Sequence, residues 1–179
     1  MDKNTLREEY INIRNSITNK DIKSVIIYNK LISDKDYINS KRIALYNSLD
    51  SEVSTKKLID YSLDKGKTVL LPVVDNDNME FYIINRNTKY NRSTFGILEP
   101  ISKDNLNKAL IDLIIVPGIC FDLNKNRIGF GKGYYDKYLS NTSIKTIGIC
   151  FDEQITNQDI DCNKYDVKVK RLISDKRSL

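Results

Sequence analysis

Apolar side chains recur every three or four residues in two stretches near the N-terminus, which is the spacing of one face of a helix. The first predicted helix covers residues 3–17, with Thr5 and Glu8 as a capping box. The second follows a similar box at residues 18–21. Its apolar positions, which we expect to face the core, are Ile22, Val25, Ile26 and Ile32.

The rest of the chain alternates short extended stretches with helical ones. Helices are predicted over residues 55–65, ended by Gly66, and over residues 131–140. Residues 113–116 are uniformly apolar, as in a central strand that is buried on both faces. The other predicted strands are residues 42–46, 68–74 with an end near Pro72, 79–84, 145–151 and an edge strand at 167–173. This alternation predicts an α/β fold, a three-layer sandwich with a largely parallel central sheet flanked by helices.

We predict a single domain over residues 1–179, because no linker rich in Ser, Gly or Pro divides the chain. Apolar runs are no longer than about four residues, too short to cross a bilayer. The polar start, Asp2-Lys3-Asn4, does not resemble a signal peptide. The three cysteines are widely spaced and form no CxxC pair, which fits a reducing compartment. A cytoplasmic protein without a membrane partner is therefore expected.

Histidine is absent, which removes the commonest general base and the commonest metal ligand. Any bound metal should therefore be a hard cation held by oxygen atoms, as magnesium is in phosphate chemistry. The net charge of +5 comes mostly from residues 167–179, where five basic side chains face one acidic one. This segment is predicted to be a solvated tail, with a nucleic-acid-binding patch as the alternative. We expect a monomer with no nucleic-acid partner.

The residues most suggestive of chemistry are 127–136, Arg-Ile-Gly-Phe-Gly-Lys-Gly-Tyr-Tyr-Asp. Three alternating glycines before a predicted helix let backbone N–H groups approach an anion. Arg127 and Lys132 add positive charge, and Asp136 is placed to hold magnesium beside phosphates. The spacing matches neither GxxxxGK[ST] nor GxGxxG. The loop therefore indicates phosphate binding, and a tight structural turn remains the alternative.

This loop and the preceding Pro-Gly-Ile-Cys-Phe-Asp at 117–122 closely resemble the signature of the 5-formyltetrahydrofolate cyclo-ligases, also called methenyltetrahydrofolate synthetases. Other segments are similar to that family in the same order along the chain. They are the Lys-x-x-x-Arg element at 3–7, the Glu-containing turn at 49–55, residues 96–100 and Asp166. Two positions depart from the pattern: Lys132 replaces a glycine, and Tyr165 stands where a histidine often precedes the aspartate.

The resemblance implies a role for each matching residue. ATP would be bound by Lys3, Arg7, Arg127, Ile128, Gly129, Phe130, Gly131, Lys132, Gly133, Tyr134 and Tyr135. Within that set Arg127 and Lys132 would act in catalysis, and Asp136 and Asp166 would hold magnesium. Asn47 and Glu52 would contact the reduced formyl folate, and Phe95 would stack on its pterin. The implied reaction is ATP-dependent closure of 5-formyltetrahydrofolate to 5,10-methenyltetrahydrofolate.

Alternatives stay open for both the residues and the function. Lys3 and Arg7 could be ordinary surface charges. Glu52 could cap a helix that starts near residue 55, and Phe95 could belong to the core. At the level of function, the alternatives are a non-catalytic nucleotide- or RNA-binding module and an enzyme like the sugar-phosphate isomerases.

Overall fold

The computed structural model describes residues 2–93 and 96–179. Its α-helices are α1 (Lys3–Ser16), α2 (Lys20–Ile32), α3 (Lys35–Asn39), α4 (Lys56–Asp64) and α5 (Tyr134–Leu139), with 3-10 turns at Lys108–Leu110 and Asp152–Gln154. The main-sheet strands are β1 (Arg42–Ala44), β2 (Thr68–Asp75), β3 (Asn78–Ile84), β6 (Leu113–Val116), β9 (Lys145–Ile149) and β11 (Arg171–Ile173). The smaller sheets contain β7 (Cys120–Asp122), β8 (Arg127–Ile128) and β10 (Ile155–Thr156), and the hairpin β4 (Tyr90–Arg92) and β5 (Leu98–Pro100).

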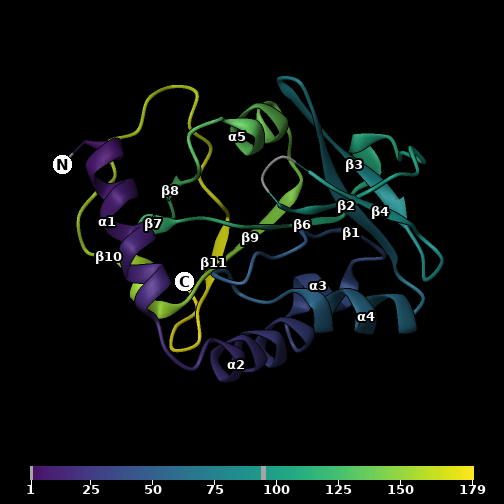
Figure 1. Cartoon of the computed structure of the whole chain (residues 1–179), viewed down its shortest axis with the longest axis horizontal. Helices are drawn as coiled ribbons and strands as arrows, with labels where there is room; N and C mark the ends of the chain where they lie inside the picture. Colours follow the sequence, from purple (N-terminus) through teal and green to yellow (C-terminus); the bar gives the residue numbers. More distant parts are fainter. Residues whose placement is uncertain (1, 94–95) are drawn as a thin grey trace.

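The main sheet has the strand order β11-β9-β6-β1-β2-β3, and every neighbouring pair is parallel except β2 and β3. Helices α2, α3 and α4 contribute to the apolar core on one face, and α5 contributes to the core on the other. Figure 1 shows these helices on opposite sides of the sheet, with α1 beside the small sheet of β7, β8 and β10. The predicted α/β class with its largely parallel sheet is confirmed.

The central strand β6 is buried along its whole length, as its uniformly apolar sequence predicts. Strand β2 differs from the prediction, because it continues through Pro72 to Asp75. Its pairing with β1 ends at Leu70, and beyond that point β2 pairs only with β3. One side of the strand is open there, so a residue without an N–H group is tolerated.

Three helix predictions were wrong in detail. Helix α1 is capped by Asp2, whose carboxylate accepts hydrogen bonds from the N–H groups of Asn4 and Thr5, and not by the predicted box. The N-cap of α2 is Asn19, in a left-handed conformation and with no side-chain hydrogen bond. Helix α5 was predicted to begin at residue 131 but begins at Tyr134, because the residues before it form the glycine loop.

The predicted core face of α2 was also wrong. Its buried residues are Ser24, Ile27, Tyr28 and Leu31. The expected core residues Ile22, Val25 and Ile26 are exposed, and Ile32 is partly buried against the core.

The C-terminal segment is not the solvated tail that the sequence predicted. Leu179 exchanges two backbone hydrogen bonds with Leu172 of β11, at 2.8 and 2.9 Å. Arg177 donates to both carboxylate oxygens of Asp152, and Arg171 forms an ion pair with Asp34. Several of its cations therefore stabilise the fold.

None of the helices in the described part of the chain is long and apolar enough to cross a membrane.

Candidate active site

The glycine loop lies between β8 and α5, beyond the carboxyl ends of the parallel strands and against α1. In an open α/β sheet, ligands bind at this edge. Arg7 of α1 donates from Nε to the carbonyl oxygen of Gly129 at 2.8 Å. A Cβ atom at Gly131 would lie 3.5 Å from the Arg7 guanidinium carbon. The structure thus brings the predicted N-terminal cation against the predicted loop.

Two glycines of this loop have a backbone conformation that other residues rarely adopt. Gly131 has φ +91° and Gly133 has φ +67°. At the third, Gly129, a Cβ atom would lie 2.7 Å from Nη1 of Arg127 and would displace that guanidinium. Lys132 is exposed between them, while Ile128 is buried in the small core beneath α1. Ile128 therefore presents only its backbone to the loop.

Arg127 and Asp136 form an ion pair beneath the loop, with Nη2 and Oδ1 3.1 Å apart. The guanidinium of Arg127 also lies over the ring of Tyr135, 5.5 Å from its centroid. Arg127 is only 8% exposed, so this cation of the loop is buried. Its charge is held in a largely desolvated place, where it interacts more strongly with a phosphate than it would in water.

The two predicted metal ligands lie close together in the fold. Oδ1 of Asp136 accepts a hydrogen bond from the N–H of Val167, the residue after Asp166. Lys3 forms an ion pair with Asp166, so the second N-terminal cation also reaches the site. Burial raises the pKa of the Asp166 carboxyl, but hydrogen bonds from Lys3 and Asn163 outweigh it and hold that pKa below its ordinary value. Asp166 is therefore an anion available to a cation.

These carboxylates fit magnesium as part of a larger ligand set. Both supply the hard oxygen atoms that magnesium prefers. Among the described residues, no group of three or more His, Cys, Asp or Glu side chains is placed to hold a metal by itself. An ion here would need further oxygen atoms, which phosphates or water would supply.

Glu52 follows β1 at the same edge of the sheet, and it is buried. Its Oε2 accepts a hydrogen bond from the N–H of Leu49 at 2.9 Å, and its Oε1 lies 3.5 Å from Nη1 of Arg14. Burial raises the pKa of Glu52 above its ordinary value, although Leu49 and Arg14 oppose that shift. The carboxylate does not cap α4, whose N-cap is Thr55. The helix-cap alternative is therefore contradicted.

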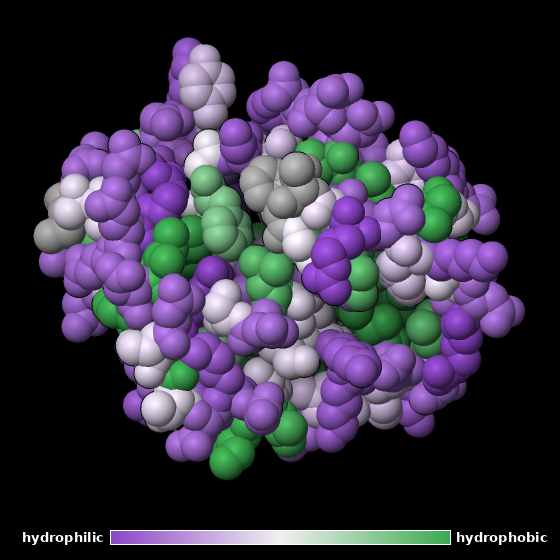
Figure 2. Space-filling model, viewed as in Figure 1, coloured by the Kyte–Doolittle hydropathy of each residue, from purple (hydrophilic) through white to green (hydrophobic). Residues whose placement is uncertain are grey.

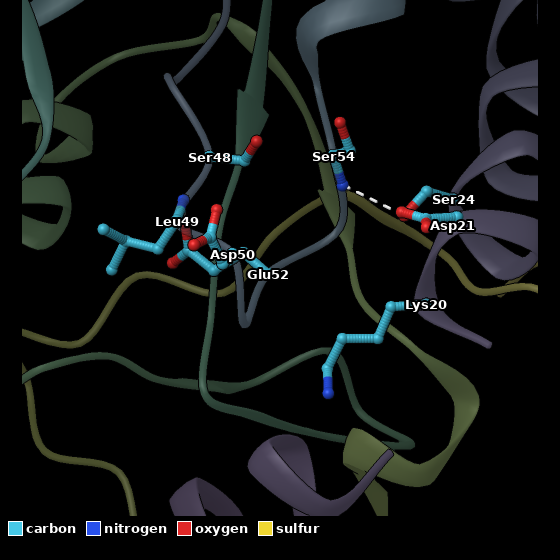
Figure 3. Close-up of a pocket in the computed structure, with 8 residues that line it drawn as sticks. All are labelled: Lys20, Asp21, Ser24, Ser48, Leu49, Asp50, Glu52 and Ser54. Atoms are coloured by element: carbon cyan, nitrogen blue, oxygen red, sulfur yellow. Dashed lines mark hydrogen bonds between the residues drawn. The ribbon is translucent and has the colours of Figure 1, made fainter. Parts of the chain in front are cut away.

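A cavity of about 290 Å³ opens beside Glu52. It is lined by polar side chains of the loop that follows β1 and of the first turns of α2, as Figure 3 shows. Lys20 extends toward it from α2, and Ser24 of α2 accepts a hydrogen bond from the N–H of Ser54. Figure 2 shows apolar side chains exposed toward the middle of a mostly hydrophilic face. The side chains that line the cavity therefore offer a ligand mainly polar groups.

The other predicted contacts are less closely tied to Glu52. The side-chain amide of Asn47 donates to the carbonyl oxygen of Leu98 on β5 at 2.7 Å. Phe95, the predicted stacking residue, lies outside the described residues.

Two aromatic residues of the predicted nucleotide loop have different environments. Tyr134 donates to the carbonyl oxygen of Asn76, which anchors the start of α5. Phe130 is 54% exposed, and its ring lies 5.3 Å from the guanidinium carbon of Arg14.

Arg14 is the residue at this site that sequence reasoning missed. It is 3% exposed and follows Leu6 and Tyr10 at intervals of four residues, so it lies on the buried stripe of α1. An arginine on an otherwise apolar helical stripe was the available signal. Its side chain contacts Glu52 on one side and Phe130 on the other.

Several buried polar atoms in this region lack a hydrogen-bond partner in the described structure. They are Nε and Nη1 of Arg14, Nε of Arg127 and the hydroxyl of Tyr135. Such atoms are rare in folded proteins and costly unless a ligand or water completes them. An α/β fold with a cation-lined glycine loop at its carboxyl edge and unsatisfied donors is typical of the open-sheet class of phosphate-binding enzymes.

Comparison with known proteins identifies the family within that class. Residues 1–175 match the model of the 5-formyltetrahydrofolate cyclo-ligase family. A 5-formyltetrahydrofolate cyclo-ligase of Mus musculus is 32% identical over 84% of this chain and 81% of its own length. A probable one of Schizosaccharomyces pombe is 31% identical over 86% and 84%.

Solved structures agree with the sequence comparison. The structure of a 5,10-methenyltetrahydrofolate synthetase from Aquifex aeolicus superposes with a TM-score of 0.87 at 29% identity, covering 99% of this chain and 92% of that one. A synthetase from Mycoplasma pneumoniae gives 0.78 at 26% identity, covering 98% and 99%. This chain belongs to the 5-formyltetrahydrofolate cyclo-ligase family, and the prediction of an enzyme of the cyclo-ligase type is confirmed.

Proposed function

We propose that this protein converts 5-formyltetrahydrofolate and ATP into 5,10-methenyltetrahydrofolate, ADP and phosphate. The observation that carries the proposal is the convergence of α1, the glycine loop and the carboxylates at one edge of the sheet. Lys3 and Arg7 were predicted to belong to the site although they lie far from the loop in sequence. In the fold Lys3 contacts Asp166, and Arg7 contacts Gly129. The relatives bear the name of this reaction.

The nucleotide would lie on the loop of residues 128–135. Backbone N–H groups freed by Gly131 and Gly133 would face its phosphates, with Arg7 and exposed Lys132 beside them. Arg127 would neutralise the charge of the transferring phosphoryl group from its buried position. Helix α5 has only six residues, so the loop and the cations supply most of the attraction.

Magnesium, when bound, would supply charge neutralisation for the phosphates. Asp136 and Asp166 are the residues that would hold it, and the phosphates would complete its oxygen ligands. Because both carboxylates already have a cationic partner, Arg127 and Lys3 would have to share them with the ion.

The folate would bind on the Glu52 side of the site. The Glu52 carboxylate would accept hydrogen bonds from the N–H edge of the pterin, with Asn47 and Phe95 as further contacts. The formamide oxygen is a poor leaving group, so the γ-phosphoryl group of ATP is transferred to it and ADP departs. N10 of the folate then attacks the formyl carbon and loses its proton. The bond between the formyl carbon and the phosphorylated oxygen breaks, and that oxygen leaves as part of inorganic phosphate. The protein contributes mainly by positioning the substrates and neutralising charge.

The alternative of an RNA-binding module is less well supported than the sequence suggested, because two of the five cations of the basic C-terminal segment, Arg171 and Arg177, form ion pairs within the fold. The cytoplasmic location and the monomeric state stay predictions.

The test is the absorbance of the methenyl product formed by the purified protein with and without ATP and magnesium. We expect product only with both, and inhibition by a metal chelator. Product forming equally well without ATP, or no product with it, would show that the proposed function is wrong.

A further inference from the structure

Arg14 has an environment that stability alone does not explain. Its side chain is almost fully buried, and its Nε and Nη1 have no hydrogen-bond partner among the described residues. Burying a charged group without full hydrogen bonding is costly. An apolar residue would simply continue the stripe of Leu6 and Tyr10. The arginine therefore needs a functional reason.

The two neighbours of Arg14 belong to different halves of the site. On one side its Nη1 lies 3.5 Å from Oε1 of Glu52, which comes from the loop after β1. On the other side its guanidinium carbon lies 5.3 Å from the centre of the Phe130 ring in the glycine loop. The Glu52 distance is too long for a full hydrogen bond but short enough for a strong charge interaction.

Resting on the proposed function, we propose that Arg14 is a positioning residue that links the two halves of the site. It holds the Glu52 carboxylate for the pterin and the Phe130 ring for the nucleotide loop, so that one side chain sets the geometry of both. A substitution in the nucleotide loop should then change the affinity for folate, even when no nucleotide is bound.

The charge of Arg14 also bears on the charge of Glu52. The groups that face Glu52 are Arg14 from α1, Tyr46 after β1 and Tyr135 from α5. Lys20 and Asp21 of α2 and Asp50 line the adjoining cavity. Arg14 is the cation among them that lowers the pKa of Glu52 against the effect of burial. Without it that pKa rises further, and the ionised form needed by a pterin appears only at higher pH.

The first test is the pH dependence of folate binding, measured by calorimetry without nucleotide. In Arg14→Gln we expect the loss of affinity on acidification to begin about one pH unit higher than in the unchanged protein. Arg14→Lys keeps the charge and should return this limb close to its original position. Arg42→Gln is the matched control, because Arg42 pairs with Asp112 at the opposite end of β1. It should lower stability and leave the pH dependence in place.

The second test starts from an exposed residue of the nucleotide loop. Phe130 is exposed, so Phe130→Leu should fold normally. We expect it to weaken folate binding about tenfold in the absence of nucleotide, since side chains in contact couple to this extent. In the Arg14→Gln background the same substitution should have no further effect, because its route to Glu52 is gone.

The outcomes separate the inference from the proposed function. If the unchanged protein binds no 5-formyltetrahydrofolate, the proposed function itself is wrong. If it binds folate, but Phe130→Leu leaves the affinity unchanged or acts equally with and without Arg14, the linking role of Arg14 is wrong. An acid limb in Arg14→Gln that coincides with that of Arg42→Gln would contradict it as well.

Discussion

Glu52 and Arg127 are the two side chains whose charges most directly define the proposed reaction, and both are buried. Each is 8% exposed. Glu52 has one backbone hydrogen bond and one distant cation, whereas Arg127 has a carboxylate at 3.1 Å and an aromatic face. Charges in such places act strongly on a ligand but also affect folding. Substitutions at these positions therefore need a stability measurement beside the kinetic one.

Glu52→Gln should weaken folate binding far more than nucleotide binding. Losing a charge-assisted hydrogen bond costs about 1.5–3 kcal/mol, or roughly a tenfold to hundredfold rise in the folate Kd. The affinity for a non-hydrolysable ATP analogue should stay within about threefold. Titration of both ligands checks this, with Glu80→Gln on the exposed side of β3 as the control. Unchanged folate affinity would remove Glu52 from the site.

Arg127→Ala should reduce both turnover and stability, because it removes a buried cation and leaves Asp136 without its partner. We expect kcat to fall at least about a hundredfold, and the melting temperature to fall as well. Asp136→Asn should raise the magnesium concentration needed for half-maximal turnover, and excess magnesium should restore part of the activity.

Kinetics per folded molecule separate these roles from a purely structural pair. If turnover per folded Arg127→Ala molecule is normal, the pair only supports the loop, and Arg127 does not assist phosphoryl transfer.

At the scale of elements, α2 shows why periodicity alone could not settle the packing. The helix carries apolar residues on two faces, one containing Ile22, Val25 and Ile26 and the other Ile27 and Leu31. Either stripe is compatible with a helix, and only the position of the sheet decides which one is buried. The main-sheet strands were predictable because their apolar runs or alternation had the length of a strand, as in β6. Helix α3 and the short strands of the two smaller sheets were not predicted. The predicted range of α5 began too early, because Gly131 and Gly133 adopt backbone conformations that do not occur in an α-helix.

The glycine loop gives a prediction at the same scale. Gly131→Ala should raise the KM for ATP more than Gly133→Ala does. Gly131 has the less accessible φ of +91°, and its Cβ would be in ordinary van der Waals contact with Arg7, so the backbone conformation is what disfavours alanine. Gly133 has φ +67°, near the left-handed region, and a Cβ there meets nothing within 4 Å. We expect a rise of about tenfold or more for the first and about threefold or less for the second. Equal effects would mean that the φ of Gly131 does not constrain the nucleotide loop more than that of Gly133 does.

At the scale of the whole molecule, the C-terminal segment closes the fold around Asp152. Ser174 and Arg177 both donate to the Asp152 carboxylate, and Leu179 pairs with Leu172. Deleting residues 174–179 should therefore lower the melting temperature by about 5–10 °C. The hydrogen bond from Arg177 holds the pKa of Asp152 below its ordinary value of 3.8. This contribution is thus present above that pH and is lost as the pH falls below it.

Melting curves of the full and shortened chains from pH 7 down to 3 check this prediction. The difference between the two chains should shrink at the acid end. A shortened chain with an unchanged melting temperature would show that the segment is a free tail after all.

The residues of the site were predictable to different extents. The loop of residues 127–136 and the pair Lys3 and Arg7 stood out through charge, glycine spacing and family resemblance. Arg14 did not, because its role depends on Glu52 and Phe130, which lie 38 and 116 positions away in sequence and meet it only in the fold. The same holds for the C-terminal cations, whose partners Asp34 and Asp152 lie on other elements.

In the proposed reaction, ATP phosphorylates the formyl oxygen before the ring closes. The most direct measurement follows that oxygen: 5-formyltetrahydrofolate labelled with ¹⁸O in its formyl group is converted by the purified protein with ATP and magnesium, and the released phosphate is analysed by mass spectrometry. We expect one ¹⁸O atom in each inorganic phosphate and one ADP for each methenyl product. Unlabelled phosphate, with the ¹⁸O released into water, would contradict it.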